Sequence, residues 1–390
     1  MPRWDIFCRV VDNYGDIGTC WRLARQLADE HEAHVRLWVD NLDRFACLCP
    51  SAATDTPVQH VGPIEVRHWQ PDFPQVDAAD VVIEAFACEL PASYVAAMTR
   101  RKEPPVWINL EYLSAETWVE GCHLLPSPRP ELPLTKYFFF PGFTSKTGGL
   151  LRERGLPAAR NAFDAAAQAE FWRGLGMAPR TDGELRVSLF CYDNAALPEL
   201  LPCWAAGPAA ITVLAAPGAA TAQVAAWLGG TLSPGQTIRK DSLTVHALPF
   251  LPQSQYDRLL WASDVNFVRG EDSFVRAQWA KHPFVWQIYP QSENAHLVKL
   301  EAFLMRYLDG FSSLDGFNGA DVVRRCWQAW NGGGDIAAAW GDFAANLRSI
   351  EQHGQVWASH LDRTGELADN LARFVRGKNI AASVNLGNVS

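Results

Sequence analysis

The sequence predicts an α/β protein with two domains, each built from a parallel sheet and helices. Short apolar runs alternate with segments of helical periodicity, which is the pattern of repeated βαβ units. A length of 390 residues suits two domains, and the 48% of hydrophobic residues can supply a core to each. Between the halves, residues 174–183 carry three glycines and one proline, so we expect the linker there.

The first half begins with an apolar run, a glycine-containing turn and a helical pattern, in that order. The helical pattern covers residues 19–30, where Trp21, Leu23 and Leu27 recur at helical spacing. The other apolar runs are short and bounded by polar residues, which indicates strands. The expected strands of this half are residues 4–11, 34–39, 81–86 and 106–110.

The second half repeats this alternation without visible sequence repetition. Its expected strands are residues 186–192, 210–215, 243–248, 265–268 and 284–289. Its expected helices are residues 197–204, 221–228, 255–262 and 273–280.

We therefore expect a first domain over residues 1–180, a second over 184–358 and a final helix over 359–377 that crosses back to the first domain. Such domains bind ligands at the carboxyl ends of their strands, which predicts a central cleft faced by both.

Charge and composition exclude several classes of protein. A net charge of −9 argues against nucleic-acid binding, which needs a basic face. No window of about 18 apolar residues is present, and the N-terminus lacks the pattern of a signal peptide, so we expect a cytoplasmic protein without a membrane anchor. The nine cysteines include no CxxC pair, so neither a disulfide framework nor a structural zinc site is indicated.

The first candidate site is the turn from Asp12 to Gly18, which follows the first strand and opens its helix. Two carboxylates, Asp12 and Asp16, lie four residues apart on either side of Gly15. Glycine allows close approach of a ligand, and a helix N-terminus offers N–H groups to an anion. The alternative is structural, with Asp16 capping the helix and Asp12 forming an Asx turn. Two aspartates could also bind a metal, but the sequence offers no third ligand.

The second candidate site is the segment from Arg269 to Ser273, again between a strand and a helix. Arg269, Gly270 and the helix N-terminus suit a diphosphate. Glu271 and Asp272 would repel it, so we expect them to face sugar hydroxyls or to cap the helix; Asp272 or Ser273 would be a good N-cap. Aromatic and amide side chains that could stack on a base or read its edge also follow strands of the second half; these are Phe190, Tyr192, Phe250, Gln253 and Tyr289.

At these residues the chain resembles the EarP family, protein-arginine rhamnosyltransferases that modify bacterial elongation factor P. The similarity spans the whole chain, and its two long motifs are much more specific than a generic glycine turn. The matching segments are residues 10–18, 21–27, 108–114, 140–143, 269–279 and 284–291.

The resemblance implies a GT-B fold of two Rossmann-like domains and a metal-independent, inverting transfer without a cofactor. The donor would be dTDP-β-L-rhamnose, and the acceptor an arginine of the N-terminal domain of elongation factor P. Asp16 matches the family's general base, and Asp12 and Glu271 match its other essential carboxylates. The donor-binding positions would be Asn13, Gly15, Phe190, Tyr192, Phe250, Gln253, Arg269, Glu271, Asp272, Ser273 and Tyr289. The acceptor side would include Asp12, Glu111 and Tyr112.

The chemistry of an arginine acceptor agrees with this assignment. A guanidinium stays protonated, with a pKa above about 12, and is a poor nucleophile. A pair of carboxylates can hold it, aim one nitrogen and accept a proton. Two alternatives remain: a GT-B transferase with another sugar or a lipid-linked acceptor, and a non-catalytic nucleotide-sugar-binding module. The latter would keep Arg269 and the aromatic residues without requiring both aspartates.

Overall fold

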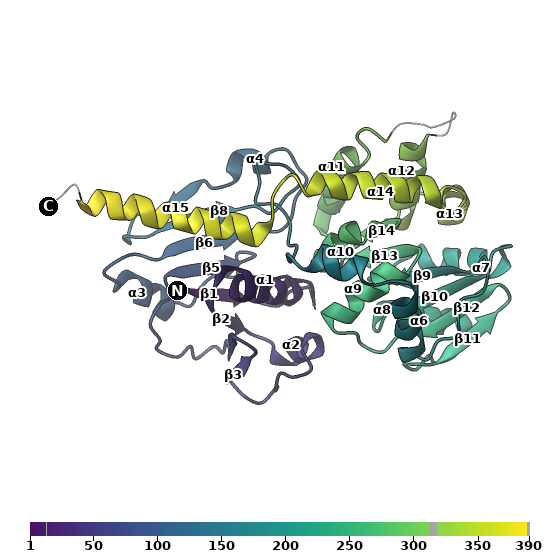
Figure 1. Cartoon of the computed structure of the whole chain (residues 1–390), viewed down its shortest axis with the longest axis horizontal. Helices are drawn as coiled ribbons and strands as arrows, with labels where there is room; N and C mark the ends of the chain where they lie inside the picture. The colour runs from purple at the N-terminus through teal and green to yellow at the C-terminus, as the bar shows by residue number, and fades with distance from the viewer. Residues whose placement is uncertain (13, 312–317, 388–390) are drawn as a thin grey trace. The chain divides into compact units, whose positions relative to one another are not determined.

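The chain folds into two compact units, which Figure 1 shows as a ribbon of the computed structural model. The structure describes residues 1–12, 14–311 and 318–387. Unit 1 comprises Met1–Arg154 and Leu361–Ser390, and unit 2 comprises Gly155–His360. Each unit contains a largely parallel sheet with helices, so the predicted α/β class is confirmed, and the two units are the Rossmann-like components of the GT-B fold.

The elements of unit 1 include eight strands in the described part of the chain. The strands are β1 (Arg3–Cys8), β2 (His34–Val39), β3 (Val58–Val61), β4 (Ile64–His68), β5 (Val81–Ala85), β6 (Val106–Leu110), β7 (Pro126–Pro128) and β8 (Thr135–Phe139). The helices are α1 (Gly15–His31), α2 (Leu42–Leu48), α3 (Ala92–Thr99), α4 (Val119–Cys122) and α15 (Leu367–Gly387).

The strand order of unit 1 places a topological switch beside its first strand. The order is β3-β4-β2-β1-β5-β6-β8-β7, with antiparallel pairs only at the two edges, β3 with β4 and β7 with β8. The chain leaves β1 toward β2 on one side and later returns to β5 on the other. Ligands of such sheets bind at the carboxyl ends of the strands at this point. The turn that carries Asp12 and Asp16 follows β1 and therefore lies at the switch.

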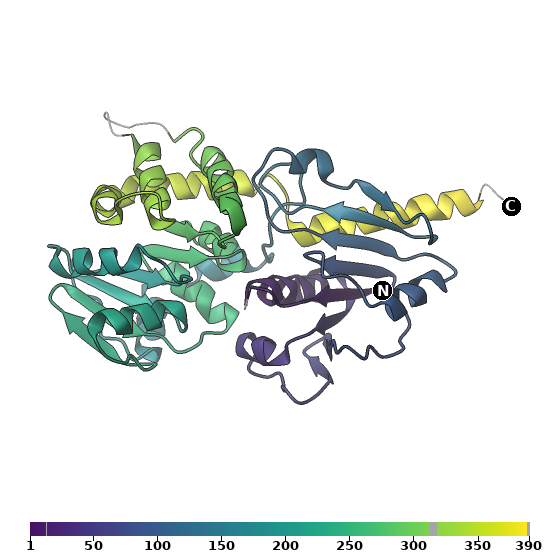
Figure 2. The same ribbon diagram turned by 180° about the vertical axis from the view of Figure 1, so that it is seen from behind.

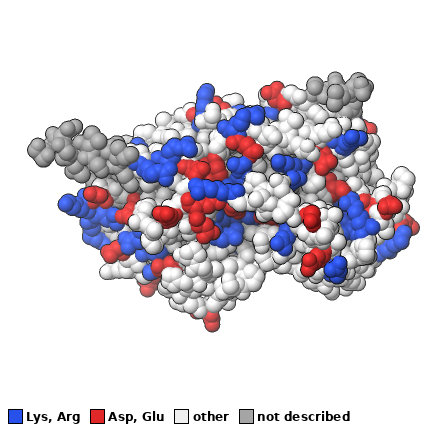
Figure 3. Space-filling model, viewed as in Figure 1, with Lys and Arg blue, Asp and Glu red and all other residues white. Residues whose placement is uncertain are grey.

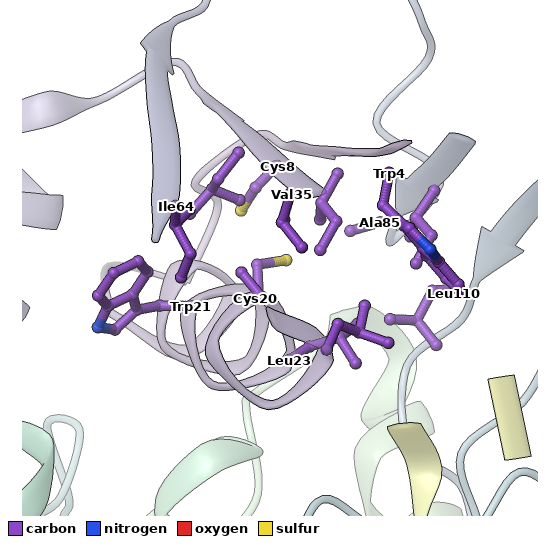
Figure 4. Close-up of a cluster of buried hydrophobic side chains, with 14 of the residues drawn as sticks. Trp4, Cys8, Cys20, Trp21, Leu23, Val35, Ile64, Ala85 and Leu110 are labelled. Atoms are coloured by element: carbon purple, nitrogen blue, oxygen red, sulfur yellow. The ribbon is translucent and has the colours of Figure 1, made fainter. Parts of the chain in front are cut away.

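The core of unit 1 packs between this sheet and its helices. Figure 4 shows part of it, with Trp4 and Cys8 from β1 facing Cys20 and Leu23 from α1. The helix α15 closes the same core with Leu367, Ala368, Leu371 and Val375, and it runs alongside the sheet in both ribbon views (Figures 1 and 2). The last segment of the chain is therefore part of unit 1, although it follows all of unit 2 in sequence.

The elements of unit 2 include six strands among the described residues. The strands are β9 (Leu185–Leu189), β10 (Ile211–Ala215), β11 (Thr237–Lys240), β12 (Leu243–Ala247), β13 (Val265–Arg269) and β14 (Phe284–Gln287). The helices are α5 (Leu156–Asn161), α6 (Ala165–Gly174), α7 (Leu197–Ala206), α8 (Ala219–Leu228), α9 (Gln253–Ala262), α10 (Asp272–Ala280), α11 (Ala295–Tyr307), α12 (Gly319–Trp330), α13 (Ile336–Ala345) and α14 (Leu347–Leu361), with a short 3-10 helix at Ser292–Asn294.

The sheet of unit 2 has its own switch, between β9 and β13. Its order is β11-β12-β10-β9-β13-β14, and all pairs are parallel except the edge pair of β11 and β12. The chain runs from β9 toward β10 and β12, then returns to β13 on the other side. The residues after β9 begin with Phe190, and those after β13 begin with Gly270. The second candidate site therefore lies at the switch point of unit 2.

The compact units differ from the predicted ranges over residues 155–183. Residues 155–180 belong to unit 2, because Phe171 and Trp172 of α6 pack with Leu214, Leu248 and Leu259 in one buried cluster. The glycine-rich segment 174–183 is fixed within unit 2 as well. Arg180 donates to the backbone carbonyl of Glu184 at 2.9 Å, and Arg186 donates to that of Ala178 at 3.0 Å. The glycines there shape a turn before β9 rather than a flexible linker.

Two surface properties bear on the predicted class. Among the described residues, no helix has the length and apolar character needed to cross a bilayer. On the face shown in Figure 3, basic and acidic side chains are interspersed. This mixture is consistent with the small acidic excess of the whole sequence.

Candidate active site

The turn after β1 is organised by the carboxylate of Asp16. Asp16 lies in the first turn of α1 and is buried, with 2% of its surface exposed. Its Oδ2 accepts hydrogen bonds from the backbone N–H groups of Val11 and Asp12, both at 2.8 Å. The N-cap of α1 is Tyr14, without a side-chain capping bond. The alternative that Asp16 serves as the helix cap is therefore wrong, since its carboxylate holds the preceding loop instead.

Opposing effects act on the pKa of Asp16. Burial raises it above its ordinary value, and the nearby negative charge of Asp12 raises it further. Hydrogen bonds from the two backbone amides and from the Tyr112 side chain lower it again, without cancelling the rise. A carboxylate with a raised pKa is a stronger base than an exposed aspartate. This environment suits proton acceptance.

Asp12 lies against Gly15 on the same turn. The backbone N–H of Gly15 donates to the Asp12 carbonyl at 2.6 Å. A Cβ on Gly15 would come within 2.7 Å of Asp12 Oδ2, so only glycine leaves the carboxylate in its place. Asp12 and Asp16 are thus brought together, as predicted. Asn13 lies outside the described residues.

Glu111 and Tyr112 follow β6, two strands from β1 in the sheet. The amide of Asn109 on β6 donates to Glu111 Oε1 at 2.5 Å, which fixes the Glu111 side chain near the strand end. The Tyr112 ring is 40% exposed and stacks on Phe86, with centroids 4.4 Å apart and planes at 17°. The Tyr112 side chain reaches the carboxylate of Asp16. Tyr112 is therefore part of the aspartate cluster.

In unit 2, Arg269 is held between two aromatic rings. Its Cζ lies 4.4 Å from the ring centroid of Phe190 and 4.3 Å from that of Tyr192. Both are cation–π contacts, which stabilise the guanidinium at this place. The Tyr192 ring meets that of Tyr289 edge to face at 5.4 Å. The sheet order explains this assembly, because β9, β13 and β14 are neighbours and these residues follow or terminate them.

The start of α10 carries the other predicted residues of this site. Gly270 has φ +61°, a left-handed conformation that favours glycine, and it turns the chain from β13 into the helix. Ser273 Oγ donates to the Arg269 carbonyl and accepts from the Arg269 N–H at 3.1 Å, so it ties the helix to the strand end. The N-cap is Glu271, without a capping hydrogen bond from its side chain. The expectation that Asp272 or Ser273 is the N-cap is wrong, because the helix begins one residue earlier.

The remaining donor-side residues lie around the same edge of the sheet. Gln253 is buried at the start of α9, and its Nε2 lies 3.5 Å from Asp272 Oδ2. Phe250 lies in the loop between β12 and α9 and is 36% exposed, and Tyr289 follows β14 and is 43% exposed. Two large aromatic side chains exposed at strand ends are available to a planar ligand.

Gln287 and Trp286 of β14 also support this site, a role that their place in the matching segment 284–291 did not reveal. Gln287 Oε1 accepts from the Tyr192 N–H at 2.8 Å, and its Nε2 lies 3.3 Å from the Asp193 carbonyl. Trp286 Nε1 donates to the Gly270 carbonyl at 2.8 Å. Both side chains are buried, and Gln287 is a polar residue at the end of a strand that is otherwise apolar. That glutamine was the local signal, but its partners come from other strands and could not be predicted from it.

One group of donor atoms in the described part of the chain could hold a metal ion, formed by His31, Glu366 and Asp369. The donor atoms lie within 4.8 Å of one another. However, Asp369 Oδ1 is also 3.2 Å from the Arg154 guanidinium, and both Glu366 oxygens accept backbone N–H groups at the start of α15. The carboxylate oxygens of this group therefore already have other partners, and the group does not include Asp12 or Asp16.

Comparisons with known proteins identify the family of the chain. A family model described as elongation factor P (EF-P) rhamnosyltransferase EarP matches residues 4–376. The protein-arginine rhamnosyltransferase of Pseudomonas putida is 50% identical over 377 residues, which cover 96% of this chain and 98% of the relative. That of Neisseria meningitidis serogroup B is 37% identical over 388 residues and covers 95% and 96%.

A solved structure gives the same result. It comes from work on the structural basis of EarP-mediated arginine glycosylation of translation elongation factor EF-P. It matches with a TM-score of 0.69 at 36% identity, and the match covers 97% of this chain and 99% of that one. Family model, sequence and structure thus agree over nearly the whole length, and the chain belongs to the EarP family of elongation factor P rhamnosyltransferases.

Proposed function

We propose that this chain carries out the reaction of its family, the rhamnosylation of an arginine of elongation factor P, with unit 1 serving the acceptor and unit 2 the donor. The observation that carries the acceptor assignment is the pair of Asp12 and Asp16 at the switch point of unit 1. Family membership favours this activity over a lipid-linked acceptor and over a silent binding module. Translation takes place in the cytoplasm, where we place the reaction.

The acceptor chemistry follows from the charges of this cluster. The arginine guanidinium is a protonated cation, and Asp12 and Asp16 would hold it by charge-assisted hydrogen bonds. As one guanidinium nitrogen attacks the sugar C1, the new C–N bond forms, the C–O bond to the diphosphate breaks, and Asp16 takes the proton lost from nitrogen. The raised pKa of Asp16 supports this role. Attack opposite the leaving group inverts the anomeric centre.

The donor in this proposal is dTDP-β-L-rhamnose, bound at the switch point of unit 2. Arg269 and the first N–H groups of α10 would neutralise the diphosphate as it leaves, and no metal ion is needed for this. The exposed rings of Phe250 and Tyr289 offer a stacking surface for the base. Glu271 is the N-cap residue of α10, just after β13, and from this place it would contact a sugar hydroxyl.

Mass spectrometry of elongation factor P tests the proposal directly. The N-terminal domain of elongation factor P, incubated with the protein and dTDP-β-L-rhamnose, should gain one deoxyhexose on a single arginine. Asp16→Asn should keep the loop, since an amide oxygen can accept the same two N–H groups, but lower the rate by about 10²–10⁴.

Asp40→Asn is a matched control, because Asp40 Oδ1 accepts the N–H of Val10 at 2.9 Å next to the same loop. It should retain near-normal activity. A folded Asp16→Asn protein with normal transfer would remove Asp16 as the base, and modification of a lipid-linked sugar instead of the protein would replace the acceptor.

A further inference from the structure

Three neighbouring strands bring Asp16, Phe86 and Tyr112 to one edge of the unit 1 sheet. β1, β5 and β6 are adjacent and parallel, so the residues that follow them lie side by side at the carboxyl edge. Asp16 belongs to the turn after β1, Phe86 comes directly after β5, and Tyr112 comes two residues after β6. The side chain of Tyr112 can therefore reach Asp16 across the end of β5, where Phe86 lies.

Phe86 is held in an unusual backbone conformation. Its φ is +55°, in the left-handed region that bulky residues rarely adopt, and Ala87 follows at +53°. Two hydrogen bonds maintain the turn: the Phe86 N–H donates to the Leu110 carbonyl at 2.7 Å, and the Ala87 N–H to Asn109 Oδ1 at 3.2 Å. Strained residues of this kind persist where the surrounding structure fixes them, and they cluster at functional sites. Here the strain delivers the Phe86 ring to the face of Tyr112.

The carboxylate of Asp16 has a limited number of positions for partners. A carboxylate offers about four lone pairs. Two backbone N–H groups occupy Oδ2, and the Tyr112 side chain provides a third hydrogen bond. Among the described residues, these donors leave about one position for a substrate N–H. The direction of that last position depends on how firmly the other three donors hold the carboxylate.

We propose that Tyr112 is a positioning residue, which is stacked on Phe86 and orients the Asp16 carboxylate through its hydroxyl. This proposal rests on the proposed role of Asp16 as the base. The hydroxyl stabilises the ionised carboxylate, since it donates to it. Among the described residues, the titratable groups that interact with Asp16 are Asp12 from the same turn, Cys8 from β1 and Tyr112 from beyond β6. Only Tyr112 among them is a side-chain donor to Asp16.

The test is the pH dependence of kcat/KM in Tyr112→Phe, which keeps the ring on Phe86 and removes the hydroxyl. We expect a roughly tenfold lower kcat, the worth of one charge-assisted hydrogen bond. The acidic limb of the profile should move to higher pH, because Asp16 loses a donor that lowers its pKa. The KM for elongation factor P and the binding of dTDP should change little. Tyr137→Phe on β8 is the control and should behave as the wild type.

Two results would overturn the proposal and still leave Asp16 as the proposed general base. One is an unchanged acidic limb in a Tyr112→Phe protein that folds normally. The other is a loss confined to the KM for elongation factor P, which would make Tyr112 a docking residue. A double-variant cycle separates the two ideas: in an Asp16→Asn background, Tyr112→Phe should have no further effect. Full activity of Asp16→Asn alone would instead remove the proposed base, and the positioning role with it.

Discussion

Replacing Arg269 by lysine should weaken nucleotide binding strongly while leaving unit 2 folded. The guanidinium carbon lies 4.4 and 4.3 Å from the ring centroids of Phe190 and Tyr192, so cation–π contacts hold the side chain before any ligand binds. Lysine keeps the charge but loses the planar fork that matches a diphosphate. A charge-assisted hydrogen bond contributes about 1.5–3 kcal/mol, and stacking on the rings roughly 0.5–1 kcal/mol more. Losing about 2–4 kcal/mol weakens binding roughly 30- to 900-fold.

Calorimetry with two ligands locates the effect. Arg269→Lys should weaken dTDP binding by the factor above, whereas binding of thymidine, which has no phosphate, should change little. Arg239→Lys is the matched control, because Arg239 lies on the edge strand β11 and donates to the Asp241 carbonyl rather than to an aromatic cluster. Its dTDP affinity should equal that of the wild type.

Tyr192 provides a second, independent check of the same reasoning. Tyr192→Phe keeps the ring beside Arg269 and should retain dTDP affinity within a few-fold, whereas Tyr192→Leu removes one face of the stack and should lower it. If Arg269→Lys bound dTDP as tightly as the wild type, or lost thymidine equally, the guanidinium would not contact the diphosphate and the assignment would be refuted.

Two further predictions concern unit 1. Gly15→Ala places a Cβ 2.7 Å from Asp12 Oδ2, which should displace that carboxylate and lower kcat/KM for elongation factor P at least tenfold in steady-state assays. Gly174→Ala is the control: its Cβ meets nothing within 4 Å, so kcat/KM should stay unchanged. Burial raises the pKa of Glu366 to about 7, above its ordinary 4.5, so the folded state binds the extra proton. The associated stability, at most about 3 kcal/mol, is present below pH 4.5 and lost as the pH rises through 7. Urea unfolding from pH 4.5 to 8 should show this fall in the free energy of unfolding, and Glu366→Gln should flatten it. An equal fall in both proteins would contradict the raised pKa.

The sequence predicted the fold class, the strands β1, β2, β5 and β6 of unit 1 and the five parallel strands of unit 2, because these strands are short apolar runs. It did not predict β4 and β8 inside the unit 1 sheet, nor the edge strands β3, β7 and β11; the residues of these five strands are largely half-buried or exposed and weakly patterned. It also assigned residues 155–180 to the first domain. That assignment followed the glycines of residues 174–183, whereas Phe171 and Trp172 of α6 are buried in the core of unit 2. Burial against distant strands is not visible in local composition.

The candidate sites were partly predictable for a similar reason. Asp12, Asp16 and Arg269 are marked by their place between a strand and a helix, which is a local property. The partners that act on the pKa of Asp16 and hold the Arg269 guanidinium follow other strands. Tyr112 follows β6 and contacts Asp16, and Phe190 follows β9 and contacts Arg269. Strand order decides these neighbours, and strand order is a property of the folded sheet. The role of Tyr112 could therefore be stated only once β1, β5 and β6 were known to be adjacent.

The identity of Asp16 is explained better by chemistry than by folding. Its structural task is to accept two N–H groups from the loop, and an asparagine could accept both with its amide oxygen. The carboxylate lies instead in a buried place beside Asp12, and because burial and the charge of Asp12 raise its pKa, ionising it costs stability. The two N–H donors and Tyr112 reduce that cost without removing it. Asp16 therefore combines a carboxylate whose ionisation lowers folding stability with a structural role that asparagine could fill. A general base has these properties, because the same desolvation that destabilises the carboxylate increases its affinity for the proton of the acceptor.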